Sequence, residues 1–217
     1  MHTDQPGPAG PLRNSYRVMR HGQSKANVSG VIVSSIEADQ QGDFGLSELG
    51  REQVLAAARG CGLPADTLIC SSDFARARQT AEVMRGSLGA GGVISAPALR
   101  ERYFGAFDGG PVTGYARVWA ADEAGGRQGG GDQGGGDQGG SGVEPAAAVL
   151  ARAAGFVADL ERGYCGRDIL LVSHGDTLQI LQAGFAGLDP ARHRTVPHLE
   201  VAEIRPLHLA PRPVTPP

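Results

Sequence analysis

A recurring order of apolar strand, polar turn and helix is the feature that most constrains how this chain can fold. The run DILLV at residues 168–172 is the most hydrophobic strand candidate, and a Ser-His-Gly turn and a helix over residues 176–186 follow it. Shorter apolar runs at residues 16–19 and 67–70 also lead into polar turns. This alternation predicts an α/β fold, a single three-layer domain with a largely parallel central sheet flanked by helices.

Helix caps and further strands complete the expected order. Three further helices are predicted. They run from Ser47 to near Gly60–Gly62, from Ser71-Ser72-Asp73 to near Ser87, and from Glu144-Pro145 to near Gly163. Two further strands are predicted over 93–95 and 199–204. Serine and aspartate satisfy free N–H groups at a helix start, and proline is tolerated in the first turn. The helix after Ser47 is expected to carry its apolar residues at Leu49, Val54, Leu55 and Ala58.

Two end segments and one insertion lie outside this pattern. The domain is expected to span residues 15–207, between a flexible Pro/Gly-rich arm at 1–14 and a Pro-rich tail at 208–217. Eleven of the 34 glycines fall between Gly125 and Gly142. A glycine-rich segment this polar cannot repay its ordering entropy by burial, so we expect a disordered surface insertion at about 124–143.

Charge and composition exclude several classes of partner. The chain has 20 basic and 23 acidic residues, which gives no support to a surface for nucleic acid or anionic membrane. No stretch approaches the roughly 20 apolar residues of a membrane span. Three cysteines without paired spacing indicate neither a disulfide framework nor a zinc site. We therefore expect a cytoplasmic protein that binds neither nucleic acid nor membrane, with its oligomeric state left open.

Polar turns are expected to meet at one edge of the sheet. In open α/β sheets, ligands bind beyond the carboxyl ends of the strands. Those ends carry Arg20 and His21 after the first strand, Arg76 in the helix after the second, and His174 after DILLV. A positive side chain in the first turn of a helix opposes the helix dipole, so Arg76 needs another explanation, whereas Arg78 is expected to be solvated.

Single motifs among these are weak evidence. Ser24 and Asn27, in the segment RHGQSKAN, could simply cap local turns. Glu101 stands between two arginines in LRERYFG, which by itself predicts a surface ion-pair cluster of little energetic value. The order and combination of the motifs are therefore more informative than any one of them.

Together the motifs are explained by one reaction, the hydrolysis of a phosphate monoester. Such a reaction needs cations around the phosphate, a nucleophile in line with the leaving oxygen, and an acid to protonate that oxygen. His21 can attack phosphorus to give a phosphohistidine, and Glu101 can act as general acid and then as general base. The phosphate cage would consist of Arg20, Arg76 and His174, with Asn27 as a neutral donor. Because arginines supply the positive charge, we expect neither a metal nor another cofactor.

The ordered set RHGxSxxN, LSELG, SSDFARARQTA, ERYFG and SHGDT resembles the phosphoglycerate-mutase-like branch of the histidine phosphatase superfamily. The resemblance covers roughly residues 16–204. It implies a phosphoglycerate mutase-like fold with His21 as the phosphorylated nucleophile, Glu101 as proton donor, and Arg20, Arg76 and His174 as phosphate ligands. It also implies a pocket lined by Gly22, Ser24, Asn27, Gly175 and Asp176.

The chain departs from the glycolytic mutases of that family. Those enzymes carry several basic residues in an insertion after the glutamate segment, whereas residues 106–143 contain only Arg117 and Arg127 against five acidic residues. A glycine-rich insertion is also a poor lid for protecting a phosphoenzyme from water. We therefore favour a phosphatase that hydrolyses a small phosphate ester over a bisphosphate-dependent mutase.

Two further expectations concern the substrate and the remaining alternative. Val31, Ile32, Val33 and Ile36 suggest an apolar wall and hence a substrate with one charged group. The non-enzymatic alternative is a phosphate-binding or scaffolding pseudoenzyme, with the Pro-rich tail as a polyproline ligand. Retention of Glu101 speaks against it, because a binding module has no evident need for a proton donor.

Overall fold

A five-stranded sheet forms the centre of the computed structural model, which describes residues 11–128 and 142–209. Its strands are β1 (Ser15–Arg20), β2 (Leu68–Ser71), β3 (Val93–Ser95), β4 (Asp168–Ser173) and β5 (Ile204–Pro206), in the order β3-β2-β4-β1-β5. The first four strands are parallel, and β5 pairs antiparallel with β1. The predicted largely parallel sheet is therefore confirmed.

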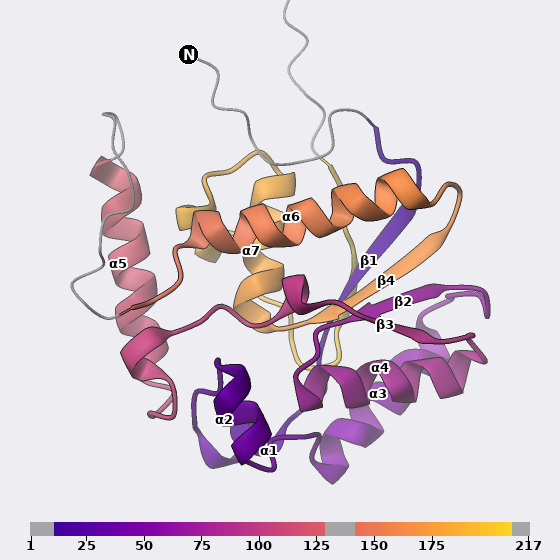
Figure 1. The fold of residues 1–217 in the computed structure, drawn as a ribbon, viewed down its shortest axis with the longest axis horizontal. Coiled ribbons are helices and arrows are strands. Elements are labelled where there is room, and N and C mark those ends of the chain that lie inside the picture. Colours follow the sequence, from indigo (N-terminus) through magenta and orange to yellow (C-terminus); the bar gives the residue numbers. More distant parts are fainter. Residues whose placement is uncertain (1–10, 129–141, 210–217) are drawn as a thin grey trace, which may run out of the picture.

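Helices cover both faces of this sheet. They are α1 (Lys25–Ser29), α2 (Ile36–Gln41), α3 (Glu48–Gly60), α4 (Ala75–Leu88), α5 (Gly114–Gln128), α6 (Ala146–Gly163) and α7 (Gly175–Phe185), with 3₁₀ turns η1 (Pro97–Leu99), η2 (Gly105–Phe107) and η3 (Pro190–Thr195). Helices α6 and α7 lie on one face, and α3 and α4 lie on the other (Figure 1). The three-layer prediction is confirmed.

Strand β4 shows how the sheet binds a layer of helices on each of its two faces. Ile169 and Leu171 pack in the cluster with α6 and α7, while Leu170 and Val172 pack in the cluster with α3 and α4. Successive side chains of a strand point to opposite faces, so a strand buried on both faces is apolar at every position. This is the physical reason for the uninterrupted run DILLV.

Several predicted caps and ends are shifted in the structure. Leu49 is 50% exposed, so the buried face of α3 rests on Val54 and Ala58 instead. Phe74, rather than the Ser-Ser-Asp sequence, occupies the N-cap of α4, and Pro145 is the N-cap of α6 rather than a residue of its first turn. Neither N-cap residue makes a side-chain cap hydrogen bond, and at α4 the backbone N–H of Ala75 donates to Asp39 Oδ2 at 2.9 Å instead.

The last predicted strand begins later than expected. Residues 199–203 form a turn, and β5 starts at Ile204. In this turn Ala202 has a φ of 59°, and its N–H lies 3.1 Å from the carbonyl oxygen of Arg20 and 3.2 Å from that of His21. Positive φ is costly for a residue with a side chain, so these backbone contacts hold the turn against strain. The alternating sequence at 199–204 therefore serves a loop that packs on the end of β1.

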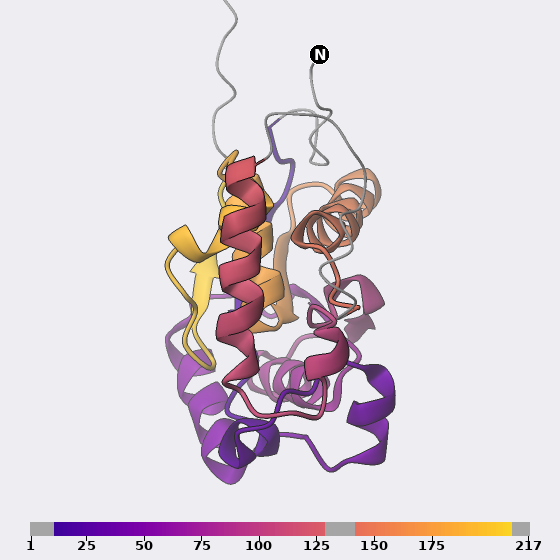
Figure 2. The ribbon, with the colours of Figure 1, turned by 90° about the vertical axis from the view of Figure 1, so that its left-hand side faces the viewer.

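Helix α5 stands apart from the three layers, over the carboxyl end of the sheet (Figure 2). A small cluster of buried side chains attaches it: Ile32, Phe104, Val118 and Val143. Ile32 and Val33 are buried, so these two residues do not form the open apolar wall that we expected.

The ends of the chain are anchored further out than predicted. Asn14, assigned to the flexible arm, is buried and donates from Nδ2 to Glu161 Oε1 at 2.7 Å. Leu209, assigned to the tail, packs against the main core. Within the predicted insertion, residues 124–128 belong to α5 and Val143 is buried. The rest of the arm, the insertion and the tail lie outside the described residues. None of the helices in residues 11–128 and 142–209 has the length and apolarity of a membrane span.

Candidate active site

The carboxyl ends of β1, β2 and β4 place their polar turns side by side. Arg20 pairs in register with Ser173, and Ser71 pairs with Val172, so the three strands end at one level. The rings of His21 and His174, which follow β1 and β4, are 5.2 Å apart between centroids at an angle of 64°. The structure thus brings the two predicted site histidines into contact.

His21 has a fixed tautomer. Its Nδ1 is 2.8 Å from the carbonyl oxygen of Gly22, which can only accept, so Nδ1 carries the hydrogen. Arg76 donates from Nε to His21 Nε2 at 3.1 Å, so Nε2 carries the lone pair. Burial, together with the charges of Arg76 and Arg20, holds the pKa of His21 well below its usual range. The imidazole is therefore neutral, with a lone pair on Nε2.

Both arginines of the predicted cage are held by backbone acceptors. Arg76 is buried and donates from Nη2 to the carbonyl of Val33 at 2.8 Å, while its Nη1 lies 3.7 Å from Asp39 Oδ1. Arg20 donates from Nη1 to the carbonyl of Leu199 at 2.9 Å and to Nε2 of His198 at 2.7 Å. These contacts orient the guanidinium groups and leave Arg20 Nε and Arg76 Nη1 without a hydrogen bond to the described residues.

Three buried nitrogens in this cage have no hydrogen-bond partner among the described residues: Arg20 Nε, Arg76 Nη1 and His174 Nδ1. They belong to the last residue of β1, the second residue of α4 and the N-cap of α7, each predicted as a phosphate ligand. Buried donors normally have partners, and charged donors bind anionic oxygens most strongly. The arrangement therefore suits an anion with several acceptor oxygens.

His174 and Gly175 form the wall at the start of α7. His174 is the N-cap of this helix, and its Nε2 lies 2.8 Å from Ser72 Oγ. Burial and the neighbouring charge of Arg76 hold the pKa of His174 well below its usual range. A Cβ on Gly175 would lie 3.4 Å from Arg20 Nε, so a side chain there would crowd the cage.

Glu101 lies at the edge of the cage as a buried carboxyl group. Its Oε1 accepts from the backbone N–H of Arg102 at 3.0 Å and of Thr177 at 3.3 Å. Burial, followed by the charge of Asp176, raises the pKa of Glu101 above that of an ordinary carboxyl group. Glu101 is thus able to keep a proton at a pH where an exposed glutamate has lost it.

The two arginines beside Glu101 differ from the expected surface ion-pair cluster. Arg100 does form a partly exposed pair with Asp73 at 2.6 Å. Arg102, however, is fully buried, and its Nη1 and Nη2 donate to the two oxygens of Asp122 at 2.6 and 2.8 Å. Arg102 therefore does not fit the alternative of a surface ion-pair cluster, because Asp122 on α5 supplies a buried counter-charge from a distant part of the sequence.

Three of the predicted pocket residues have evident structural roles. Ser24 and Asn27 form the capping box of α1, in which Asn27 N donates to Ser24 Oγ at 3.1 Å and Ser24 N donates to Asn27 Oδ1 at 2.9 Å. Only the Nδ2 end of Asn27 is left for a ligand. Gly22 is required by packing, because a Cβ there would lie 2.5 Å from the carbonyl oxygen of Gly50.

Asp176, predicted to line the pocket, takes part in a buried network. Its Oδ1 accepts from Trp119 Nε1 at 2.8 Å and lies 3.0 Å from His193 Nε2, and its Oδ2 accepts from Arg102 at 3.3 Å. Burial alone would raise the pKa of Asp176, but the hydrogen bond to His193 and the charge of Arg102 lower it. The carboxylate joins α7 to α5 and η3.

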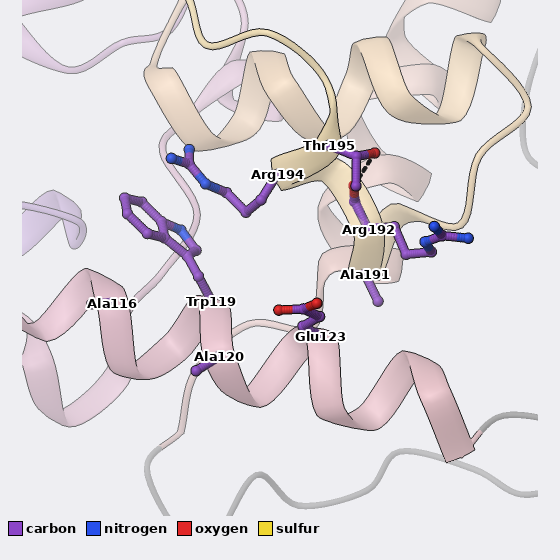
Figure 3. Close-up of a pocket in the computed structure, with 8 residues that line it drawn as sticks. All are labelled: Ala116, Trp119, Ala120, Glu123, Ala191, Arg192, Arg194 and Thr195. Carbon is purple, nitrogen blue, oxygen red and sulfur yellow. Dashed lines mark hydrogen bonds between the residues drawn. The ribbon is translucent and has the colours of Figure 1, made fainter.

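Other residues near the cage were missed by sequence reasoning. His198 contacts Arg20, and Tyr115 stacks on Trp119 with ring centroids 5.4 Å apart. Arg192 and Arg194, on η3, line a pocket against α5 (Figure 3). These two arginines add positive charge to that of Arg117 and Arg127, the two basic residues counted in residues 106–143. The basic run ARHR at 191–194 is the only sequence signal that could have suggested them.

Comparison with known proteins gives a consistent result. A model of the family described as "Histidine phosphatase superfamily (branch 1)" matches residues 17–213. Glucosyl-3-phosphoglycerate phosphatase of Mycobacterium tuberculosis is 32% identical over 183 residues, which cover 80% of this chain and 76% of that protein. The metal-independent phosphoserine phosphatase of Arabidopsis thaliana is 27% identical over 176 residues, with 78% and 70% covered.

Solved structures agree in fold. The native structure of mycobacterial glucosyl-3-phosphoglycerate phosphatase matches with a TM-score of 0.69 at 27% identity, and 88% of each chain is covered. The complex of that phosphatase with inorganic phosphate matches with a TM-score of 0.66 at 27% identity, again with 88% of each chain covered.

Proposed function

The chain belongs to branch 1 of the histidine phosphatase superfamily and is a phosphatase of that family, and we propose that it hydrolyses a small phosphate monoester through a phosphohistidine at His21. The observation that carries this proposal is the tautomer of His21. Gly22 fixes the hydrogen on Nδ1, and Arg76 points at the lone pair on Nε2. A neutral imidazole with an oriented lone pair is the form that attacks phosphorus.

In the first step, Arg76 Nε releases its hydrogen bond to His21 Nε2, and Nε2 forms a bond to phosphorus while the bond from phosphorus to the ester oxygen breaks. Arg20, Arg76 and His174 would bind the phosphate oxygens through the nitrogens that have no hydrogen-bond partner among the described residues. Positive groups already in place stabilise the charge that develops in the transition state. Glu101, whose pKa burial raises, would transfer its proton to the departing alcohol oxygen.

In the second step, water attacks the phosphorus of the phosphohistidine. Glu101, now a carboxylate, would take a proton from that water, and the bond between phosphorus and Nε2 would break. Inorganic phosphate leaves, and His21 returns to its neutral state with Glu101 protonated. The cycle balances without a metal, since the charge on the phosphate is met by side chains.

The names of the similar proteins support a phosphate monoester as the class of substrate. The relatives are named for phosphoserine and glucosyl-3-phosphoglycerate, both phosphate monoesters, and one related structure is a complex with inorganic phosphate. For this chain we propose a phosphate monoester of a small organic alcohol.

Release of inorganic phosphate from a panel of monoesters tests the proposal. The panel contains p-nitrophenyl phosphate, phosphoserine, 3-phosphoglycerate and glycerol 3-phosphate. His21→Ala is expected to lower kcat/KM by at least about a thousandfold, while Arg59→Ala, an exposed arginine on α3, changes it less than about twofold. Full activity of His21→Ala would reject the proposal. Conversion of 3- to 2-phosphoglycerate faster than its hydrolysis would instead indicate a mutase.

A further inference from the structure

Residues 98–103 form the segment that carries Glu101, and this Glu101 segment lies beside helix α6 (Figure 1). Arg152 of α6 contacts its backbone. The Nη1 of Arg152 donates to the carbonyl oxygens of Ala98 at 2.7 Å and of Arg100 at 2.9 Å. Its Nη2 donates to the carbonyl oxygen of Glu101 at 3.3 Å. Because all three acceptors are backbone groups, Arg152 holds the path of the chain through Glu101 itself.

The remaining N–H groups of Arg152 donate to Glu144. Its Nε lies 2.8 Å from Glu144 Oε1, and its Nη2 lies 3.0 Å from Glu144 Oε2. All five N–H groups of this guanidinium therefore have an acceptor, and a carboxylate meets its charge. Arg20 and Arg76, in contrast, each keep a buried nitrogen without a hydrogen-bond partner among the described residues. Arg152 is thus placed to hold protein groups, whereas the cage arginines are placed to bind a ligand.

Glu144 holds the Glu101 segment at its other end. The backbone N–H of Glu144 donates to the carbonyl oxygen of Tyr103 at 2.8 Å, and Glu144 Oε2 accepts from the backbone N–H of Tyr103 at 3.2 Å. The carbonyl oxygen of Glu144 accepts from Arg102 Nε at 2.7 Å. The bonded pair of Arg152 and Glu144 therefore clamps the segment on both sides of Glu101.

The position of the Glu101 carboxyl group depends on this backbone. Its Oε1 accepts from the backbone N–H of Arg102, inside the clamped segment, and from that of Thr177 on α7. Thr177 Oγ1 also donates at 2.8 Å to the carbonyl oxygen of Arg100, the oxygen that Arg152 contacts as well. A shift of the segment would move the carboxyl group relative to the cage. A misplacement of about 1 Å in a catalytic group can lower the rate by about a hundredfold.

We propose that Arg152 is a positioning residue for Glu101, and that together with Glu144 it holds the Glu101 carboxyl group within reach of the departing ester oxygen. The proposal rests on the function proposed above, because it needs Glu101 as the general acid. Arg152 itself does not touch the substrate. It acts on the protonation of the leaving alcohol and leaves the binding of the phosphate to the cage.

Esters with different leaving groups test this proposal. An alkyl phosphate needs a proton on its leaving oxygen, whereas p-nitrophenyl phosphate needs little help from an acid. The alkyl ester used is the one among phosphoserine, 3-phosphoglycerate and glycerol 3-phosphate that the wild type hydrolyses best. Arg152→Ala is expected to lower kcat/KM at least about tenfold for that ester, but less than about threefold for p-nitrophenyl phosphate. Arg162→Ala, which removes an exposed arginine from the same helix, is the matched control and should change neither value more than about twofold.

A double substitution shows whether Arg152 acts through Glu101. In the Glu101→Gln background, Arg152→Ala is expected to lower kcat/KM for the alkyl ester by less than about a further twofold, because the positioned group can no longer supply a proton. Arg152→Lys keeps a positive charge beside Glu144 but lacks the planar fork that reaches several acceptors, so the loss with the alkyl ester should persist. Thermal unfolding checks the fold of each variant, and Arg152→Lys is the variant used if Arg152→Ala does not fold.

The outcomes separate this proposal from the proposed function. Equal losses with the two kinds of ester, or an undiminished loss in the Glu101→Gln background, would give Arg152 a structural role alone and overturn the proposal, while the phosphatase stands. If the wild type hydrolyses none of the esters, the proposed function fails and this inference fails with it. If Glu101→Gln hydrolyses the alkyl ester as fast as the wild type does, Glu101 is not the acid, and the inference is overturned for that reason.

Discussion

Arg76 Nε and His21 Nε2 are joined by a hydrogen bond of 3.1 Å in which the arginine is the donor. A guanidinium cannot accept a hydrogen bond, so this contact requires an unprotonated Nε2. Because the Nδ1 hydrogen is held by Gly22, protonation of His21 would force Arg76 away from it. The neutral form of His21 is therefore required both for its role as the proposed nucleophile and for the observed position of Arg76, a proposed phosphate ligand.

Stability is expected to fall when the solution is acidified below about pH 6.5. Burial and neighbouring charges hold the pKa values of His21 and His174 below the ordinary value of 6.5. Above that pH both rings are neutral in the folded and unfolded chains, so they contribute no pH dependence. Below it the unfolded chain takes up protons that the folded chain cannot bind, and folding loses free energy.

Unfolding midpoints between pH 5 and pH 8 check this. The wild-type Tm should drop as the pH falls below 6.5, and the double substitution of His21 and His174 by Gln should give a shallower drop. An equally steep drop in the double variant would assign the acid sensitivity to other groups.

Glu101→Gln is expected to raise stability while lowering activity. The pKa of Glu101 is raised by burial and by Asp176, so as the pH rises the folded chain keeps this proton longer than the unfolded chain does. Stability from this group is present at low pH and is lost as the pH rises. Glutamine cannot ionise, so at pH 8 we expect a gain of about 1 kcal/mol, or roughly 2–4 °C in Tm.

Activity of the same variant should depend on the leaving group. Hydrolysis of glycerol 3-phosphate, whose alkoxide needs a proton, should fall by about a hundredfold or more. A lower Tm together with unchanged hydrolysis would contradict both roles of Glu101.

Gly22→Ala should disturb both packing and the position of His21. A Cβ at this residue would lie 2.5 Å from the carbonyl oxygen of Gly50 and 2.8 Å from Val54 Cγ2, and a helix backbone cannot easily retreat. We expect a loss of about 1–3 kcal/mol in the free energy of unfolding, and reduced kcat. Gly86→Ala on α4, where a Cβ meets nothing within 4 Å, is the control and should be neutral or stabilising. Equal stability of the two variants would contradict the close approach.

Removing one partner of the buried ion pair between Arg102 and Asp122 should be strongly destabilising. Arg102 is fully buried, so Asp122→Ala leaves a charge whose remaining counter-ion among the described residues is the more distant Asp176. A cost of about 3–5 kcal/mol is expected in chemical denaturation. Glu82→Ala, which breaks an exposed pair with Arg85, should cost less than about 1 kcal/mol. Similar small losses in both variants would show that Arg102 tolerates the loss of its partner.

The parts of the fold that follow from local pattern could be predicted from the sequence. DILLV predicts a strand buried on both faces, and the turns after the parallel strands bring His21, Arg76 and His174 together because such strands end at one edge. The cap at Ser47 was also predicted, since its side chain accepts from Gly50 N as serine caps do.

Contacts between distant segments could not be predicted in the same way. Helix α5 was not predicted, and it is held by the contact of Trp119 with Asp176 and that of Asp122 with Arg102. Nothing in the local sequence gives these pairings. For the same reason the buried state of Arg102 appears only in the structure.

The most direct test of the central claim is a rapid-quench experiment on Glu101→Gln with p-nitrophenyl phosphate. This ester has a good leaving group that needs little help from an acid, whereas release of phosphate from His21 would lack its general base. We predict a burst of about one equivalent of p-nitrophenol per enzyme and an acid-labile, alkali-stable phosphoryl group on His21, located by peptide mass spectrometry. Hydrolysis without a burst, or a phosphoryl group on any residue other than His21, would contradict the account.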